Sequence, residues 1–132
     1  MASKKFSVGF PGGKKVDVTY GDFVVKTDQP QADGGDGSAV SPFELFFCSI
    51  AACAGFYALE FCQARNISTE GMRIDMEAEK AEGEKLYGKI SIILKLPAGF
   101  PEKYKGAIVK AMDTCTVKKH LQNPPQFVLS VE

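Results

Sequence analysis

The sequence predicts an α+β fold in which antiparallel sheets surround a long central helix. The 132 residues fit one domain, residues 1–132, because smaller pieces could not bury a core. Strand-like and helix-like segments are grouped along the chain instead of alternating one by one, which is typical of α+β proteins. Residues 43–62 are apolar on nearly every side, as expected for a helix at the centre of the fold.

The first 27 residues predict a small antiparallel meander. Apolar side chains alternate with polar or small ones in the first two of three short runs, the third run is continuously apolar, and turns at Pro11–Gly13 and Gly21–Asp22 separate the runs. Residues 28–41 follow as a loop rich in Asp, Gly, Pro and Ser. The three runs are marked by Phe6, Val8 and Phe10, by Val16, Val18 and Tyr20, and by Phe23, Val24 and Val25.

The central helix is predicted to begin at Ser41 and Pro42, because serine suits the N-cap and proline suits the first helical position. Asn66 is a plausible end. Twenty apolar residues could span a bilayer, but Glu44 and Glu60 interrupt the run and no basic cluster flanks it. We therefore expect a core helix and no membrane association. Burying every face of this helix in so small a chain requires a second subunit.

The second half of the chain predicts two further strands, two helices and a last strand. Residues 72–79 alternate between apolar and charged side chains, and a second strand is expected over residues 86–96. Pro101 opens the next helix, and a short helical stretch is expected over residues 116–121. The chain is predicted to close with a strand carrying Phe127, Leu129 and Val131.

Composition excludes several classes of function. Sixteen Lys and Arg balance sixteen Asp and Glu, which argues against a nucleic-acid binder or a polybasic membrane binder. The single histidine, His120, excludes a multi-histidine metal site, so we expect no metal and no cofactor. The first residues contain no apolar signal segment, which leads us to expect a cytoplasmic protein with reduced cysteines.

Helix geometry limits how the four cysteines can pair. Cys48 and Cys53 are roughly 140° apart around the helix, and Cys53 and Cys62 point to opposite faces. Neither pair can form a disulfide without unwinding the helix. If a cysteine of this helix has a redox partner within the chain, that partner is Cys115. Each helix cysteine could equally serve as a small buried hydrophobe.

Polar side chains follow one line along the otherwise apolar helix. Ser49, Cys53, Tyr57 and Glu60 are spaced to lie on one face, and buried polar groups need partners or water. This stripe could face solvent or a wet subunit interface, or it could form a site. Cys115 stands at the start of a short helix, a position that favours the thiolate, although core packing would explain it too.

Two motifs resemble the OsmC/Ohr family, and the resemblance covers essentially the whole chain. The segment Ser41 to Phe47 followed by Ala51-Ala52-Cys53 is similar to the start of the family's central helix. Cys115-Thr116-Val117 with Leu121 resembles the family's second cysteine motif, usually Cys-Pro-Val followed by a leucine. The resemblance implies an intertwined homodimer with two sites at the subunit interface.

The resemblance also implies roles for individual residues. Cys53 would attack a hydroperoxide and Cys115 would resolve the resulting sulfenic acid, with an external thiol as reductant. Family peroxidases use an arginine from an N-terminal turn and a glutamate ten residues before the cysteine. Here a lysine, Lys14 or Lys15, stands near the arginine's place, and Glu44 lies nine residues before Cys53, with Phe43 at the tenth position. This Phe–Glu order looks more like the YhfA-type branch.

Three interpretations therefore compete, and the last of them is a plain structural or interaction dimer with no ligand. The first is a thiol-dependent peroxidase for small or apolar hydroperoxides, with Cys53, Cys115, Glu44 and Lys14 as catalytic residues. The second is a dimeric module that binds an apolar small molecule at its interface without catalysis. In the first case, a cation must offset the effect of burial on Cys53, because an apolar setting raises a thiol's pKa. The substrate would meet Phe46, Tyr57 and Glu60.

Overall fold

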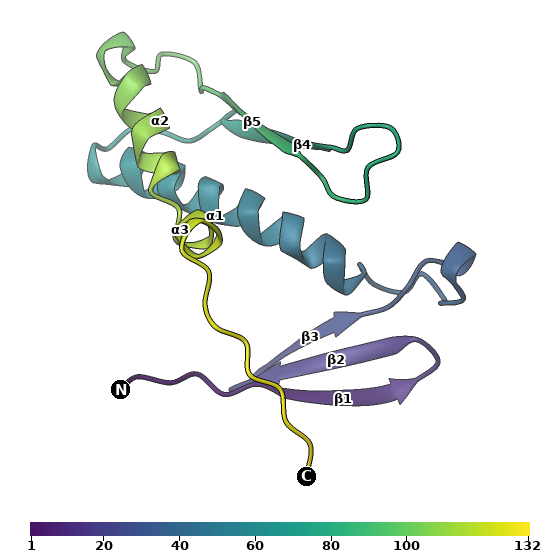
Figure 1. Ribbon diagram of the computed structural model, residues 1–132. Coiled ribbons are helices and arrows are strands. Elements are labelled where there is room, and N and C mark those ends of the chain that lie inside the picture. Colours follow the sequence, from purple (N-terminus) through teal and green to yellow (C-terminus); the bar gives the residue numbers. More distant parts are fainter. The chain divides into compact units, whose positions relative to one another are not determined.

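The computed structural model describes all residues from 1 to 132 (Figure 1). Two compact units, residues 1–46 and residues 47–132, are described in turn. The order of elements follows the prediction up to the last helix: three strands, a long helix, two strands and two short helices. The α+β class with two antiparallel sheets is confirmed.

The first unit contains a three-stranded antiparallel sheet. Strands β1 (Ser7–Gly12), β2 (Lys15–Tyr20) and β3 (Phe23–Thr27) are paired in that order. Val18 lies opposite Val8 on one side and Val25 on the other, so the alternating pattern places the apolar side chains on a single face. We call this face the apolar face of β1–β3. It is exposed: Phe10 retains 81% and Phe23 retains 71% of its accessible surface.

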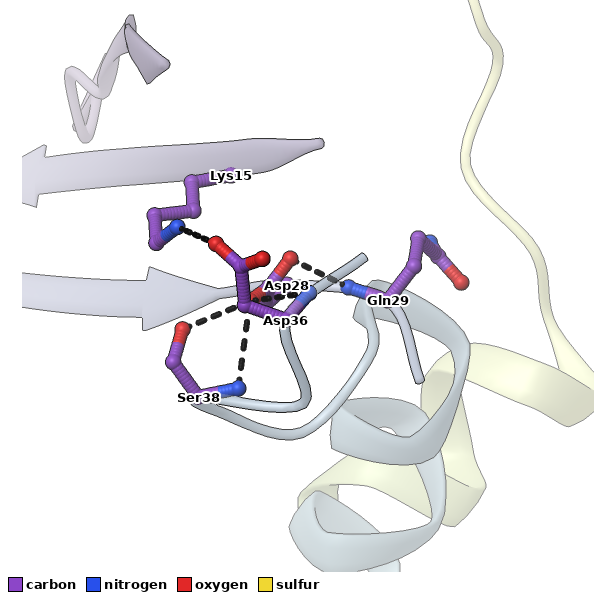
Figure 2. Close-up of polar contacts among 5 residues, drawn as sticks. All are labelled: Lys15, Asp28, Gln29, Asp36 and Ser38. Atoms are coloured by element: carbon purple, nitrogen blue, oxygen red, sulfur yellow. Dashed lines mark hydrogen bonds and ion pairs between the residues drawn. The ribbon is translucent and has the colours of Figure 1, made fainter. Parts of the chain in front are cut away.

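The loop after β3 is organised by one buried carboxylate, Asp28. Its oxygens accept hydrogen bonds from the backbone N–H groups of Gln29 and Ser38 and from the Ser38 hydroxyl, at 2.6–3.1 Å (Figure 2). These bonds, the one from Ser38 first among them, lower the pKa of Asp28 to about 2 against the opposing effect of burial. Gly35 must be glycine, because a Cβ there would lie 2.0 Å from the Gln29 carbonyl oxygen.

Helix α1 (Pro42–Ala64) begins with a capping box. The Ser41 hydroxyl accepts a hydrogen bond from the Glu44 N–H, and the Glu44 carboxylate accepts one from the Ser41 N–H, both at 3.2 Å. The helix ends before Asn66, which adopts a left-handed conformation with φ of 55°. By length and composition α1 could cross a membrane, but the core helix of a soluble protein meets the same criteria.

The second unit packs a hairpin and two helices against α1 (Figure 1). Strands β4 (Arg73–Glu79) and β5 (Lys89–Lys95) are antiparallel, followed by helices α2 (Lys105–Asp113) and α3 (Thr116–Gln122). The core consists of Ala58, Phe61, Cys62 and Ile108. The half-buried side chains around it come from the hairpin, from α2 and from the connecting segments; they are Ile67, Met72, Ile74, Leu94, Leu96, Phe100, Tyr104, Ala111 and Met112.

The predicted closing strand does not form in the single chain. Residues 123–132 have no regular structure, and Phe127, Leu129 and Val131 are almost fully exposed. The alternating sequence is that of a strand, but a strand exists only beside a neighbour that accepts its hydrogen bonds. Within this chain the segment is paired with none of the five strands.

Candidate functional site

Cys53 and Cys115 lie in hydrogen-bonding contact. Cys53 is half-buried in the middle of α1, and Cys115 is buried in the connection between α2 and α3, with 1% of its surface exposed. All four cysteines are free thiols. The segment after α2 therefore reaches the middle of the central helix, which is the arrangement that a disulfide between these two cysteines requires.

The pKa values of the two thiols are shifted in opposite directions. Burial alone would raise the pKa of Cys53, but hydrogen bonds from the Cys115 thiol and from the backbone N–H groups of Val117 and Thr116 outweigh it, so its pKa is lowered. The pKa of Cys115 is raised, first by burial and then by its hydrogen bond to Cys53. At a given pH, Cys53 is thus the thiol of the pair that ionises more readily.

A third contact joins the same two segments. The Tyr57 hydroxyl lies 2.9 Å from the Thr116 hydroxyl, within hydrogen-bonding distance. Tyr57 is one helical turn beyond Cys53, and Thr116 directly follows Cys115. The segment carrying Cys115 is therefore attached to α1 both at the thiol pair and one turn further along.

An apolar cavity of about 340 Å³ opens onto Cys115 from the side of the hairpin. The side chains of Lys110 and Lys118 border it, and the Lys118 ammonium forms an ion pair with Asp113. Sequence reasoning did not identify this cavity, because its walls come from four separate elements that no local pattern relates. The apolar lining consists of Ile50, Ala54, Ile90, Ile92, Leu94, Val109 and Met112.

Two of the three residues expected to meet substrate are neighbours. Tyr57 and Glu60 border a shallow depression of about 270 Å³ together with Arg65 from the end of α1. Phe46 lies in the first unit, half-buried, with its ring stacked on Phe43 at a centroid distance of 6.0 Å. The predicted polar stripe is exposed at Glu60 and half-buried at Cys53 and Tyr57.

The predicted activating groups lie in the first unit. Glu44 belongs to the capping box of α1, a role that the sequence analysis had not assigned to it. Lys14 is exposed in the turn between β1 and β2, whereas the Lys15 ammonium forms an ion pair with Asp36. The S-x-x-E signal for a capping box was readable in the sequence at Ser41 to Glu44.

The other two cysteines differ from the pair. Cys62 is fully buried in the core, and burial raises its pKa while nearby Arg65 opposes the effect. Cys48 is exposed. No group of three His, Cys, Asp or Glu side chains is arranged to hold a metal ion.

Comparison with known proteins identifies similar folds. Residues 35–130 match the model of a family described as OsmC-like protein. A protein of Psychrobacter arcticus 273-4 described as an osmotic-stress-induced and detoxification-response protein is 19% identical, with a TM-score of 0.74 over 90% of this chain and 88% of its own. An OsmC-like protein of Mycoplasma pneumoniae is 14% identical, with a TM-score of 0.70 over 93% and 89%.

A third solved structure carries a functional description. It is an organic hydroperoxide resistance protein OsmC of Legionella pneumophila, 19% identical, with a TM-score of 0.59 over 92% of this chain and 90% of its own. At these identities the structures establish the fold. A search of curated proteins found no match.

Proposed function

This chain belongs to the OsmC-like protein family, and on that premise we propose that it is a thiol-dependent reductase of small organic hydroperoxides. Its family and its structural neighbours support a redox protein of the stress response. The observation that carries the finer proposal is the direct contact between Cys53 and Cys115, with Cys53 the more acidic thiol.

The reaction begins at Cys53. Its thiolate attacks the distal oxygen of the hydroperoxide, the O–O bond breaks, and the alkoxide leaves as an alcohol after taking a proton. Cys53 is then a sulfenic acid, oxidised by two electrons. Hydrogen bonds from Thr116 and Val117 stabilise the attacking thiolate before this step.

Cys115 completes the oxidative half of the cycle. Its sulfur attacks the sulfenic sulfur of Cys53, the hydroxyl leaves as water, and a disulfide forms. Two equivalents of an external thiol then reduce the disulfide by exchange. The raised pKa of Cys115 keeps it protonated until Cys53 has been oxidised, because burial and the neighbouring thiolate both oppose its ionisation.

Supporting roles follow from the family resemblance. Lys14 is the cation that activates the thiolate, and Glu44 is the carboxylate that orients it. Because nine residues place Glu44 on the opposite face of α1 from Cys53, this carboxylate acts on the Cys53 of a second copy of the chain. Phe46, Tyr57 and Glu60 line the approach of the substrate. The capping box allows a clean test of Glu44, because glutamine serves equally well at its position, so Glu44→Gln removes the charge and keeps the helix start.

The decisive experiment is a titration with peroxide. One equivalent should consume two thiols per chain, and peptide mapping should find a Cys53–Cys115 disulfide. Cys115→Ser should stop at the sulfenic acid, and Cys53→Ser should abolish the fast reaction. Cys48→Ser and Cys62→Ser are matched controls that should leave the rate unchanged. A Cys53 that reacts no faster than free cysteine would refute the peroxidase.

A second experiment separates the two glutamates. If Glu44 activates the thiolate, Glu44→Gln should slow peroxide reduction while thermal unfolding is unchanged. If the polar stripe governs the substrate instead, Glu60→Gln should be the damaging change. Wild-type turnover in both variants would remove both carboxylates from the mechanism.

We further propose that the protein acts as an intertwined homodimer in the cytoplasm. Members of this family are generally dimeric and soluble. In the single chain, the apolar face of β1–β3 and the apolar residues Phe56 and Leu59 of α1 are exposed. The unpaired C-terminal segment has the pattern of a strand, which a partner's sheet would complete. Sedimentation of a folded monomer at micromolar concentration would contradict this proposal.

The cavity beside Cys115 favours a second candidate function, the binding of an apolar small molecule. The cavity is lined mostly by apolar side chains, as small-molecule sites are, and its volume of about 340 Å³ lies in their range. Native mass spectrometry would detect a co-purified ligand. Retention of that ligand in a protein lacking both Cys53 and Cys115, together with slow peroxide reaction of the wild type, would favour binding over catalysis.

A further inference from the structure

Tyr57 lies one helical turn beyond Cys53 and reaches the residue that follows Cys115. The distance between its hydroxyl oxygen and that of Thr116 is 2.9 Å. We propose that Tyr57 is a positioning residue, which holds the segment Cys115–Val117 against Cys53 through the hydroxyl of Thr116. The inference rests on the proposed peroxidase and gives Tyr57 a second role, besides its place on the approach of the substrate.

Thr116 takes part in two contacts at once. Its backbone N–H donates to the Cys53 sulfur, and its side-chain hydroxyl pairs with Tyr57. Val117, the next residue, donates a second backbone N–H to the same sulfur. A hydrogen bond weakens steeply when its angle departs from linearity. Fixing the Thr116 side chain therefore fixes the direction of both N–H groups toward Cys53.

The segment meets α1 first at the buried Cys115, whose thiol contacts Cys53. Cys115 has an extended backbone, with φ of −48° and ψ of 126°, and α3 begins directly after it without a side-chain cap. Thr116 is itself exposed, so packing does not fix its side chain. The hydroxyl pair with Tyr57 therefore acts beside the thiol pair in orienting the start of α3 relative to α1.

Three substitutions separate the hydroxyl from the backbone donor. Tyr57→Phe and Thr116→Val each remove one half of the hydroxyl pair and keep every N–H. Thr116→Pro removes the hydroxyl and one N–H donor together. Proline fits this position sterically, because it suits the first residue of a helix and an extended residue precedes it.

The readout is the rate of alkylation of Cys53 as a function of pH, in a background with Cys48 and Cys62 replaced by serine. We expect Tyr57→Phe and Thr116→Val each to raise the pKa of Cys53 by about half a unit, as the weakening of one hydrogen bond predicts. The double variant should be no worse than either single one, because both remove the same contact. Thr116→Pro should raise the pKa further.

Tyr104→Phe is the matched control, since it removes a tyrosine hydroxyl from the core near α2 and should leave the profile unchanged. An unchanged profile in Tyr57→Phe, or additive shifts in the double variant, would overturn the inference. If Tyr57→Phe fails to fold, Thr116→Val decides alone. The alkylation assay contains no peroxide, so a shifted profile in a protein without peroxidase activity would refute the proposed function and retain this inference.

Discussion

The two antiparallel sheets are built on the same alternating pattern but lie in different surroundings. In the hairpin, the apolar pairs Met76–Ile92 and Ala78–Ile90 are half-buried on one face, and the other face is mostly charged. In β1–β3 the alternation is interrupted by a register shift in β1, and Val8 and Phe10 are exposed. A sheet with one apolar face needs a second layer. The hairpin has one within the second unit, whereas the first unit contains no second layer for β1–β3.

This difference bears on the homodimer proposed above. Isolated hydrophobic side chains on a surface need no explanation, but a contiguous apolar face marks an interaction site. The predicted strand around Phe127 and Leu129 is unpaired in the same chain. Both features are satisfied at once if a second copy covers the sheet and pairs with the segment. Substitutions in one sheet at a time test this difference between the two sheets.

The largest effect is expected for a charge placed at the centre of the apolar face. Val18→Asp should raise the dimer dissociation constant by at least ~100-fold, because burying an unpaired charge costs several kcal/mol. Thr19→Asp puts the same charge on the opposite, polar face and should leave the dimer intact. Sedimentation at micromolar concentration measures both. A Val18→Asp protein with the mass of the wild type would show that this face is not an interface.

The core of the second unit should depend on packing within the chain alone. Ile108 is fully buried, so Ile108→Ala should lower the free energy of unfolding by about 3 kcal/mol at any protein concentration. Val25→Ala, on the apolar face of β1–β3, should cost about 1 kcal/mol in the dimer and almost nothing in a monomer. Urea unfolding at two protein concentrations tests this. If the losses of unfolding free energy in the two variants depended on protein concentration in the same way, the two sheets would not differ as described.

Acid should destabilise the first unit through Asp28. Its pKa of about 2 in the folded protein lies below the ordinary 3.8 of an aspartate, so its stabilising contribution is complete above pH 4 and is lost as the pH falls toward 2. Asp28→Asn should lower stability at neutral pH and flatten the loss between pH 4 and 2. Asp75→Asn in the hairpin should have a smaller effect on both the stability and its pH dependence, because that carboxylate is half-exposed. Thermal unfolding across this pH range measures both.

The smallest effect is expected at the start of α1. Ser41→Ala should lower the free energy of unfolding by about 1 kcal/mol, because it removes the oxygen that accepts the Glu44 N–H. Glu44→Gln should cost less, since an amide oxygen can replace the carboxylate in the capping box. Chemical denaturation distinguishes the two. A larger loss for Glu44→Gln would show that its charge stabilises the helix beyond the cap.

Local sequence patterns were sufficient to predict most of the helices and strands. Alternation predicted β1, β2 and β4, an apolar run after a turn predicted β3, and Ser41-Pro42 predicted the start of α1, because these signals depend on neighbours within a few residues. The second strand of the hairpin is shorter than expected, Lys89–Lys95 in place of residues 86–96. Pairing with β4 ends at Lys89, and a strand extends only as far as its partner.

Part of the cysteine geometry could be predicted from the sequence. Helical spacing excluded pairing of Cys53 with Cys48 or Cys62 and left Cys115, and the structure places Cys115 against Cys53. The donors at Thr116 and Val117, the link from Tyr57 to Thr116 and the cavity beside Cys115 could not be derived in this way. They join α1 to residues about sixty positions further along, and no local pattern records that contact.

Periodicity and residue type, which act over a few neighbouring positions, were enough to predict the α+β class, the central helix and the alternating faces of the sheets, and the family resemblance added the two candidate cysteines. The hydrogen bond between the buried Cys115 and Cys53, and the absence of a partner for the last strand in the single chain, could be seen only in the folded chain. The pKa of a thiol and the formation of a strand both depend on groups that folding brings close, wherever they stand in the chain.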